Sequence, residues 1–215
     1  MGYALENPRP LNYYARGRYA IHYFDAGEYL IKECTRAEGI YRIRSGMAKV
    51  VCEDKEGKQH IIGILGAGDF IGMEALLGDA CYRMSVIALE DLSAYYLTQE
   101  QMKALLDVRP SLYGVLLDRL HQLLARVDAI ELEGKDSRTS GQRLASVILE
   151  LYERFAEENG CLDVDVSQSD LANFAGISRQ TFYRIINRWK EAGILDIKNH
   201  QLCIKAPERL EQLAT

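Results

Sequence analysis

The chain has 215 residues, an apolar content of 48% and a formal net charge of −5. This length and composition favour a folded, soluble protein with room for one large domain or two modest ones. No apolar run approaches the roughly 18 residues that span a bilayer, and no signal-peptide pattern is present, so we expect a cytoplasmic protein without a membrane partner. The acidic total also argues against nucleic-acid binding by the whole surface.

Five cysteines and four histidines are scattered singly along the chain. They form no C-x-x-C pair and no matching histidine spacing, so we predict no metal site and expect reduced, structural thiols. A lone histidine is more often a hydrogen-bonded polar residue than a ligand. The sequence also has no nucleophile–base pairing, paired-carboxylate motif or phosphate loop. We therefore predict no catalytic residues and no enzymatic function.

Residues 19–97 consist of short apolar runs, such as RYAIHYF and KQHIIGIL, separated by glycine turns. The runs are rich in Ile, Val and Tyr, and the turns include Ala26-Gly27, Ser45-Gly46 and Glu56-Gly57. This pattern is typical of antiparallel strands that close into a barrel or a sandwich.

Helical patterns follow. Residues 98–110 predict a short helix that ends near Pro110, and a longer helix begins after it. Apolar residues of the longer helix recur at spacings of 3, 4, 3, 4 and 3, at Tyr113, Leu116, Leu120, Leu123, Val127 and Ile130. This 3.5-residue period favours a two-stranded dimer seam. Leu117 and Leu124 add a second stripe; the alternative is a single core helix in a monomer.

The segment ELEGKDSRTSGQ, residues 131–142, is polar and glycine-containing, and it marks a domain boundary. We therefore predict a β-domain over residues 1–110, a dimerisation helix over 111–134 and a DNA-binding domain over 135–215. The last of these opens with another amphipathic helix, RLASVILELYERFAEENG.

Residues 168–187 fit the helix-turn-helix template in both residue type and spacing. Ser167 and Asp170 form a capping-box-like start, and Gly176 stands where the turn favours a positive φ. Ser178 is positioned to cap the second helix. The residues expected to be buried between the two helices are Leu171, Ala172, Ala175, Ile177, Phe182 and Ile185. The pattern predicts a DNA-reading unit.

The second helix is predicted to place its N-terminal residues in the major groove. Arg179 and Arg184 have the chemistry to bind guanine, and Gln180 has the chemistry to bind adenine. Phosphate contacts are expected from Ser169, Ser178 and Thr181, and Arg188 is included in the predicted DNA-binding set.

The segment ILDIKNHQLCIKA then predicts a strand, a turn and a second strand, which together form a wing. Lys198 at its tip is expected to bind a phosphate. Residues 167–191 contain four basic and two acidic residues, so this segment carries a net charge of +2 and the rest of the chain carries −7.

From about Tyr19 to Ala206 the chain resembles the cyclic-AMP receptor protein/FNR (CRP/FNR) superfamily of bacterial transcription regulators. SRQTFYRII is similar to that superfamily's Ser-Arg-Glu-Thr-x-x-Arg recognition helix, and GDFIGMEALLG followed by Arg83 is similar to its phosphate-binding cassette. The resemblance implies an α+β fold: a cupin-like, cyclic-nucleotide-binding-domain-like antiparallel β-roll, a long dimerisation helix and a C-terminal winged helix-turn-helix. It also implies that Arg179 and Arg184 read bases.

The recognition motif departs from the superfamily pattern at one position, where Gln180 replaces the usual glutamate. Glutamate accepts a hydrogen bond from cytosine, whereas a neutral amide both donates and accepts, as adenine requires. We therefore predict an altered or relaxed preference at the base pair beneath Gln180.

The ligand cassette departs further. Gly72 and Arg83 keep the superfamily spacing, but Met73 replaces the ribose-binding glutamate and Met84 replaces the phosphate-binding serine. Glu74 is one residue late and, on a strand, would face the opposite side. The predicted effector pocket comprises Gly72, Met73, Glu74, Arg83, Met84 and Ser85.

Each missing polar contact is worth roughly 1 kcal/mol or more when buried, so cyclic AMP is disfavoured as the effector. Two roles are open for Arg83: binding of another anion, or a salt bridge with a neighbouring carboxylate. Haem sensing through His22 or His60, redox sensing through Cys52 or Cys81, and a pocket without a ligand all stay open. The iron–sulfur branch is disfavoured because the first cysteine is Cys34.

The sequence thus predicts an allosterically controlled homodimer that binds a pseudo-palindromic operator on double-stranded DNA and contacts RNA polymerase. The effector, a small molecule if there is one, is unknown. The alternative is a β-roll module that signals through protein contacts and carries a vestigial DNA-binding domain.

Overall fold

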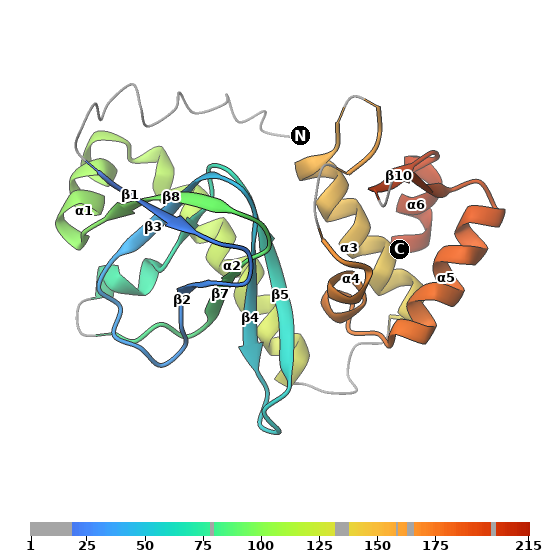
Figure 1. The fold of residues 1–215 in the computed structure, drawn as a ribbon, viewed down its shortest axis with the longest axis horizontal. Coiled ribbons are helices and arrows are strands. Elements are labelled where there is room, and N and C mark those ends of the chain that lie inside the picture. The colour runs from blue at the N-terminus through green and yellow to red at the C-terminus, as the bar shows by residue number, and fades with distance from the viewer. Residues whose placement is uncertain (1–18, 78–79, 132–137, 158, 163–165, 199–200) are drawn as a thin grey trace.

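The computed structural model of the protein describes residues 19–215, apart from 78–79, 132–137, 158, 163–165 and 199–200. Two folded parts lie side by side: an N-terminal β-roll with its helices, and a C-terminal helical domain that carries a small hairpin (Figure 1). The predicted α+β class is confirmed.

The β-roll consists of two antiparallel sheets. Their strand orders are β1-β8-β3-β6 and β2-β7-β4-β5. The strands are β1 (Ala20–Phe24), β2 (Tyr29–Ile31), β3 (Ile40–Ser45), β4 (Ala48–Glu53), β5 (Gln59–Leu65), β6 (Phe70–Ile71), β7 (Ser85–Ala88) and β8 (Leu92–Leu97). A short 3₁₀ helix, η2 (Met73–Leu77), follows β6. The glycine-punctuated runs therefore form the predicted antiparallel sheets.

Strand β5 stands between two hydrophobic cores. Its residues 61–65 are all buried, which requires cover on both faces. Ile62 belongs to the core inside the β-roll, whereas Ile61 and Ile64 belong to a second core shared with the C-terminal domain. The two parts of the chain are thus packed together through this strand.

Three helices follow the β-roll: α1 (Gln99–Val108), α2 (Ser111–Glu131) and α3 (Ser140–Phe155). α1 begins with a capping box in which Thr98 and Gln101 satisfy each other's backbone amides. α2 lies along the β-roll, and its buried residues Leu112, Leu116 and Leu123 join the inner core (Figure 1).

The C-terminal domain contains α3, α4 (Gln168–Phe174), α5 (Arg179–Glu191), the wing strands β9 (Leu195–Lys198) and β10 (Gln201–Ile204), and α6 (Pro207–Ala214). The wing strands pair antiparallel, as predicted. α6 was not predicted; it begins at Pro207 and packs against α3 through the fully buried Leu210.

Polar contacts fix the helix-turn-helix to the β-roll. The Asn173 side chain donates to the carbonyl of Gln59 at 3.0 Å and accepts from the amide of Ile61 at 2.7 Å, so it occupies part of the edge of β5. Lys49 on β4 pairs with Asp170 on α4 at 2.7 Å. The first helix of the DNA-reading unit is therefore bound directly to the second sheet.

The carbonyl of Ile64 joins three elements. It accepts from Arg119 of α2 at 2.9 Å and from Arg154 of α3 at 2.7 Å, and Arg154 also pairs with Asp69 at 2.5 Å. Burial lowers the pKa of the Arg119 guanidinium, and the nearby Arg154 charge lowers it further. Hydrogen bonds to this one carbonyl therefore join β5 to α2 and to the C-terminal domain.

The expectation of reduced thiols is wrong for two of the five cysteines. Cys161 and Cys203 form a disulfide across 42 residues of sequence. The spacing of the cysteines could not show this pairing, because it depends on how the segment after α3 lies beside the wing. Cys34 and Cys81 are exposed and Cys52 is buried, and none of the three is disulfide-bonded.

Four aromatic side chains pack together on the first sheet. The ring of His22 stacks on that of Tyr96 with centroids 5.1 Å apart, and the Tyr41 hydroxyl lies 3.3 Å from His22 Nδ1. Phe24 packs edge-on against Tyr41. Burial raises the pKa of the Tyr41 hydroxyl to about 12, and the nearby Tyr82 and Tyr96 hydroxyls add to this shift.

This raised pKa predicts a loss of stability in alkali. The unfolded chain releases the Tyr41 proton near pH 10, whereas the folded chain holds it to about pH 12. The contribution is fully present below pH 10 and is lost as the pH rises from 10 to 12, because the unfolded state then binds fewer protons. Urea midpoints measured across this range should fall less steeply in Tyr41→Phe than in the wild type.

The matched control is Tyr23→Phe, since the Tyr23 side chain is 73% exposed on β1 of the same sheet. This variant should keep the wild-type pH dependence. An equally steep fall in Tyr41→Phe would show that this hydroxyl does not cause it.

Candidate nucleic-acid interface and effector pocket

The helix-turn-helix is built as its sequence predicts. Ser167 accepts from the amide of Asp170 at the start of α4, and Ser178 accepts from the amide of Thr181 at the start of α5. Gly176 in the turn has φ +62°, a conformation that glycine adopts without steric cost. The capping box at α4 is only half formed, because the Asp170 carboxylate contacts the Ser167 hydroxyl and Lys49.

α5 has a buried apolar face and an exposed face that is mostly polar. Phe182, Ile186 and Trp189 are buried against the rest of the domain. The predicted base-reading residues Arg179, Gln180 and Arg184 are all exposed, as is Arg188. The N-terminal half of α5 therefore presents two guanidinium groups and one amide to solvent, the groups best suited to hydrogen bonding with base edges.

The predicted phosphate-binding residues lie around the same helix end. Arg179 Nε donates to the Ser169 hydroxyl at 2.8 Å, which joins the starts of α4 and α5. The Ser178 hydroxyl donates to that of Thr181 at 2.9 Å. Lys198 is exposed at the end of β9, and the wing turn beyond it lies outside the described residues.

A cleft of about 1390 Å³ separates this helix end from the β-roll. Ser169, Ser178 and Arg179 line one wall, and Lys58 and His60 of the β4–β5 hairpin lie in its lining as well. Most charged residues in the lining are basic, including Arg126, Arg138, Arg143 and Arg154; the acidic ones are Glu150 and Glu153. The positive charge of α5 is therefore continued beyond the helix itself.

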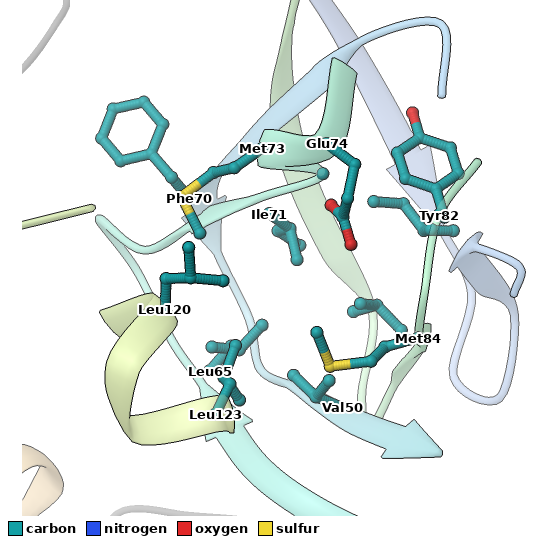
Figure 2. A pocket seen from close by; sticks show the side chains of 13 residues that line it. Val50, Leu65, Phe70, Ile71, Met73, Glu74, Tyr82, Met84, Leu120 and Leu123 are labelled. Atoms are coloured by element: carbon teal, nitrogen blue, oxygen red, sulfur yellow. The ribbon is translucent and has the colours of Figure 1, made fainter. Parts of the chain in front are cut away.

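The predicted effector pocket is a small, mostly apolar cavity in the β-roll. It measures about 30 Å³, close to the volume that one water molecule occupies in the liquid. Side chains from β4, β5, β6, β7, η2 and α2 surround it (Figure 2). Ligand pockets are usually 300–1,000 Å³, so this side-chain packing leaves no space for a cyclic nucleotide.

Four of the six predicted pocket residues line this cavity: Gly72, Met73, Glu74 and Met84. The other two do not. Arg83 is exposed, and Ser85 is buried where its hydroxyl accepts from the amide of Glu33 at 2.9 Å. Neither belongs to the cavity lining.

The predicted orientation of Glu74 is wrong. Met73 and Glu74 lie on the 3₁₀ helix η2, so the alternation of a strand does not apply and both residues line the cavity. Figure 2 shows the Glu74 carboxylate directed inward between Tyr82 and Met84. Glu74 also accepts from the backbone amide of Arg83 at 3.3 Å.

The two histidines named as candidate haem ligands lie on different sheets. His22 on β1 is part of the aromatic cluster, and His60 on β5 pairs with Asp54 at 2.6 Å. This hydrogen bond is the main cause of the lowered pKa of the Asp54 carboxyl. Both rings therefore have partners within the protein.

Two family models match the chain, one for each folded part. Residues 21–109 match the cyclic nucleotide-binding domain, and residues 142–213 match the Crp-like helix-turn-helix domain. The chain belongs to the CRP/FNR superfamily. The predicted family is therefore confirmed, and the protein is a DNA-binding transcription regulator.

Known proteins agree with this assignment. The chain is 27% identical over 192 residues to the fumarate and nitrate reduction regulatory protein of Escherichia coli K12, covering 87% of this chain and 76% of that protein. FixK2 from Bradyrhizobium japonicum has a similar fold, with TM-score 0.77, 21% identity and coverage of 92% and 98% of the two chains. A CRP/FNR-family transcriptional regulator from Thermus thermophilus gives TM-score 0.67, 24% identity and coverage of 91% and 98%.

In this CRP/FNR regulator the predicted dimer residues on α2 are divided between two environments. Leu116 and Leu123 are buried in the β-roll core, and Val127 packs against it. Tyr113 is 51% exposed and Leu120 is 37% exposed, whereas the side chain of Ile130 lies outside the described residues. Leu116 and Leu123 therefore differ from prediction, because their side chains fill their own domain.

The exposed apolar stripe runs along Tyr113, Leu117, Leu120 and Leu124. These residues follow the same 4, 3, 4 spacing as a seam, and Leu117 and Leu124 are the pair that the sequence placed in a second stripe. Leu120 and Leu123 also line the β-roll cavity. Leu120 thus belongs to both the exposed stripe and the cavity lining, so the stripe and the predicted effector pocket lie on adjacent faces of a single helix.

The contacts between the domains of the regulator were missed by sequence reasoning. Asn173 and Asp170 look like ordinary polar positions of α4, and their partners on β4 and β5 lie more than 100 residues away in the sequence. No periodicity or spacing signals such pairs.

Among the described residues, no helix is long and apolar enough to cross a membrane.

Proposed function

We propose that this regulator binds a pseudo-palindromic operator as a homodimer, with one α5 in the major groove of each half-site. The observation that carries the proposal is the outward array of Arg179, Gln180 and Arg184 on a helix whose opposite face is buried. Two-fold symmetry would place the two helices about one turn of DNA apart, roughly 34 Å. Arg179 and Arg184 would each bind a guanine, and Gln180 an adenine.

The remaining predicted residues would set the position of the domain on the phosphate backbone. Ser169, Ser178 and Thr181 surround the N-terminal ends of α4 and α5, where backbone amides favour an anion. Arg188 and Lys198 would add charge contacts along α5 and the wing. Such contacts fix the register without reading sequence.

Selection from a random duplex library tests this proposal. The wild-type protein should enrich inverted half-sites whose centres are 10–10.5 base pairs apart. Enrichment of single half-sites only would argue against the symmetric dimer. No enrichment at all would leave the alternative, a β-roll module with a vestigial DNA-binding domain.

The same selection repeated with Gln180→Glu should move the preference at one position of each half-site. A carboxylate accepts from cytosine N4, so the base pair that Gln180 contacts should change towards one with cytosine on the contacted strand. We expect about a tenfold change in relative affinity at that position, and no change at the others.

The isosteric exchange should keep the helix and its packing, because Gln180 is exposed and is not one of the buried residues of α5. Thermal midpoints of the two proteins should therefore agree. Identical selected sequences would show that residue 180 does not read a base.

We further propose that the β-roll controls DNA binding through α2 and β5 and that the effector is not cyclic AMP. Leu120 and Leu123 line the cavity from α2, and the Ile64 carbonyl joins β5 to both α2 and α3. A molecule that enlarges this cavity would displace these elements together. The proposal assigns no catalytic role to any residue, and it places the protein in the cytoplasm in contact with RNA polymerase.

The absorption spectrum and the mass spectrum of the purified protein test for a bound effector, including haem. A tightly bound small molecule should be released on unfolding. Cyclic AMP in that fraction, or tighter operator binding on adding cyclic AMP, would contradict the proposal.

A further inference from the structure

The Cys161–Cys203 disulfide joins neighbouring strands of the DNA-binding domain. The two residues face each other in an antiparallel bridge with Cα atoms 3.8 Å apart. A hydrogen bond flanks the pair on each side: Leu162 donates to the carbonyl of Leu202, and Ile204 donates to that of Gly160, both at 2.9 Å. The paired backbone thus places Cys161 and Cys203 directly opposite each other.

The covalent bond closes a loop around the DNA-reading unit. Between Cys161 and Cys203 lie α4, α5, β9 and part of β10. The wing itself consists of only two strands of four residues, and an isolated two-stranded hairpin is marginally stable in water. The disulfide attaches a third segment to this hairpin and so restricts how far the wing moves from α5.

A transcription regulator works where DNA is, in a compartment that keeps most thiols reduced. Disulfides in such compartments are usually transient and serve catalysis or redox sensing. We propose that Cys161 and Cys203 form a reversible redox switch, and that the oxidised form binds the operator more tightly. This inference rests on the proposed function, because it requires that α5 and the wing bind DNA together.

The chemistry is thiol–disulfide exchange with a low-molecular-weight disulfide of the glutathione class. Cys161 is 9% exposed and Cys203 is fully buried, so the Cys161 thiolate attacks first. It forms a mixed disulfide and releases one small thiol. The Cys203 thiolate then attacks Sγ of Cys161 and releases the second. Two protein thiols lose two electrons and two protons, and one small disulfide becomes two thiols.

The test compares full-length protein treated with reduced or oxidised glutathione. Alkylation under denaturing conditions followed by peptide mapping should recover the Cys161–Cys203 link only after oxidation. The operator Kd should be at least about fivefold lower for the oxidised protein, the lower end of typical coupling between two states. Its thermal midpoint should rise by about 10 °C, because the cross-link constrains the unfolded chain.

Three variants separate the switch from other effects. Cys161→Ala/Cys203→Ala should lose the response, whereas the matched control Cys34→Ala/Cys81→Ala, which removes the two exposed thiols, should keep it. Lys198→Ala should reduce the increase in operator affinity that oxidation causes, because that increase depends on contacts between the wing and DNA. If the first variant fails to fold, the redox response of operator affinity in the wild type and in the control, together with the mapped Cys161–Cys203 link, still tests the switch.

Several outcomes would overturn the switch. These are equal operator affinity of the oxidised and reduced wild type, absence of the Cys161–Cys203 link after oxidation, and a response that survives in Cys161→Ala/Cys203→Ala. Sequence-specific binding that is insensitive to redox state overturns the proposed switch but leaves the proposed function intact. Loss of sequence-specific binding in both states contradicts the proposed function instead.

Discussion

Replacing Arg179 and Arg184 together by alanine should weaken binding to the selected operator by at least about 1,000-fold. Each bidentate arginine–guanine pair contributes roughly 1–3 kcal/mol of discrimination, and a symmetric dimer makes four of them. Both side chains are exposed on α5, so their removal leaves the buried face formed by Phe182, Ile186 and Trp189 intact. Fluorescence anisotropy on labelled operator measures the loss.

Binding to unrelated DNA should fall much less, because the non-specific affinity comes from phosphate contacts, which the proposal places around the ends of α4 and α5 and at the wing. The variant should also keep the wild-type thermal midpoint to within a few degrees. Arg44→Ala, which removes an exposed arginine from the β-roll, is the matched control and should bind the operator normally. An operator affinity that stays within tenfold of wild type in the double variant would exclude α5 as the reading helix.

Aspartate at both Leu117 and Leu124 should convert the proposed homodimer into folded monomers. These residues are 64% and 43% exposed in the single chain, so the change costs little there. In a dimer whose seam is the exposed stripe, four carboxylates would be buried without partners, each at a cost of several kcal/mol. The dimer dissociation constant should therefore rise by at least about 1,000-fold, as sedimentation measurements can show.

Operator binding should weaken in parallel, because each monomer reads only one half-site. Val115→Asp is the matched control: Val115 is an apolar residue of the same helix, 42% exposed, and it lies outside the stripe. It should remain dimeric. A Leu117→Asp/Leu124→Asp protein that is still dimeric at micromolar concentration would place the interface elsewhere.

The long helix α2 shows which features of a helix its sequence periodicity can predict and which it cannot. The 3.5-residue pattern predicted a helix, and α2 covers Ser111–Glu131. It did not show which of two stripes belongs to the chain's own core. Leu116 and Leu117 are adjacent, and a rotation of about 100° decides that one is buried in the β-roll and the other exposed. Which of the two stripes is buried depends on how the helix docks on the sheets.

The helix-turn-helix was more predictable because its constraints are local. Ser178, Gly176 and Phe182 act within a few residues of one another, so their types and spacing specify caps, turn and buried face. The effector pocket depends instead on side chains from many elements. The expectation that Glu74 would face the opposite side from residue 73 fails, because it assumed a strand where the structure has a 3₁₀ helix. The Cys161–Cys203 pairing likewise depends on tertiary register.

The docking of the two domains through Asn173 also protects the β-roll against aggregation. β5 is an edge strand, and exposed edges are templates on which other chains add strands. The Asn173 amide occupies the Gln59 carbonyl and the Ile61 amide, so this part of the edge is closed to intermolecular pairing. A β-roll separated from its DNA-binding domain would lose this cover and gain a site for self-association.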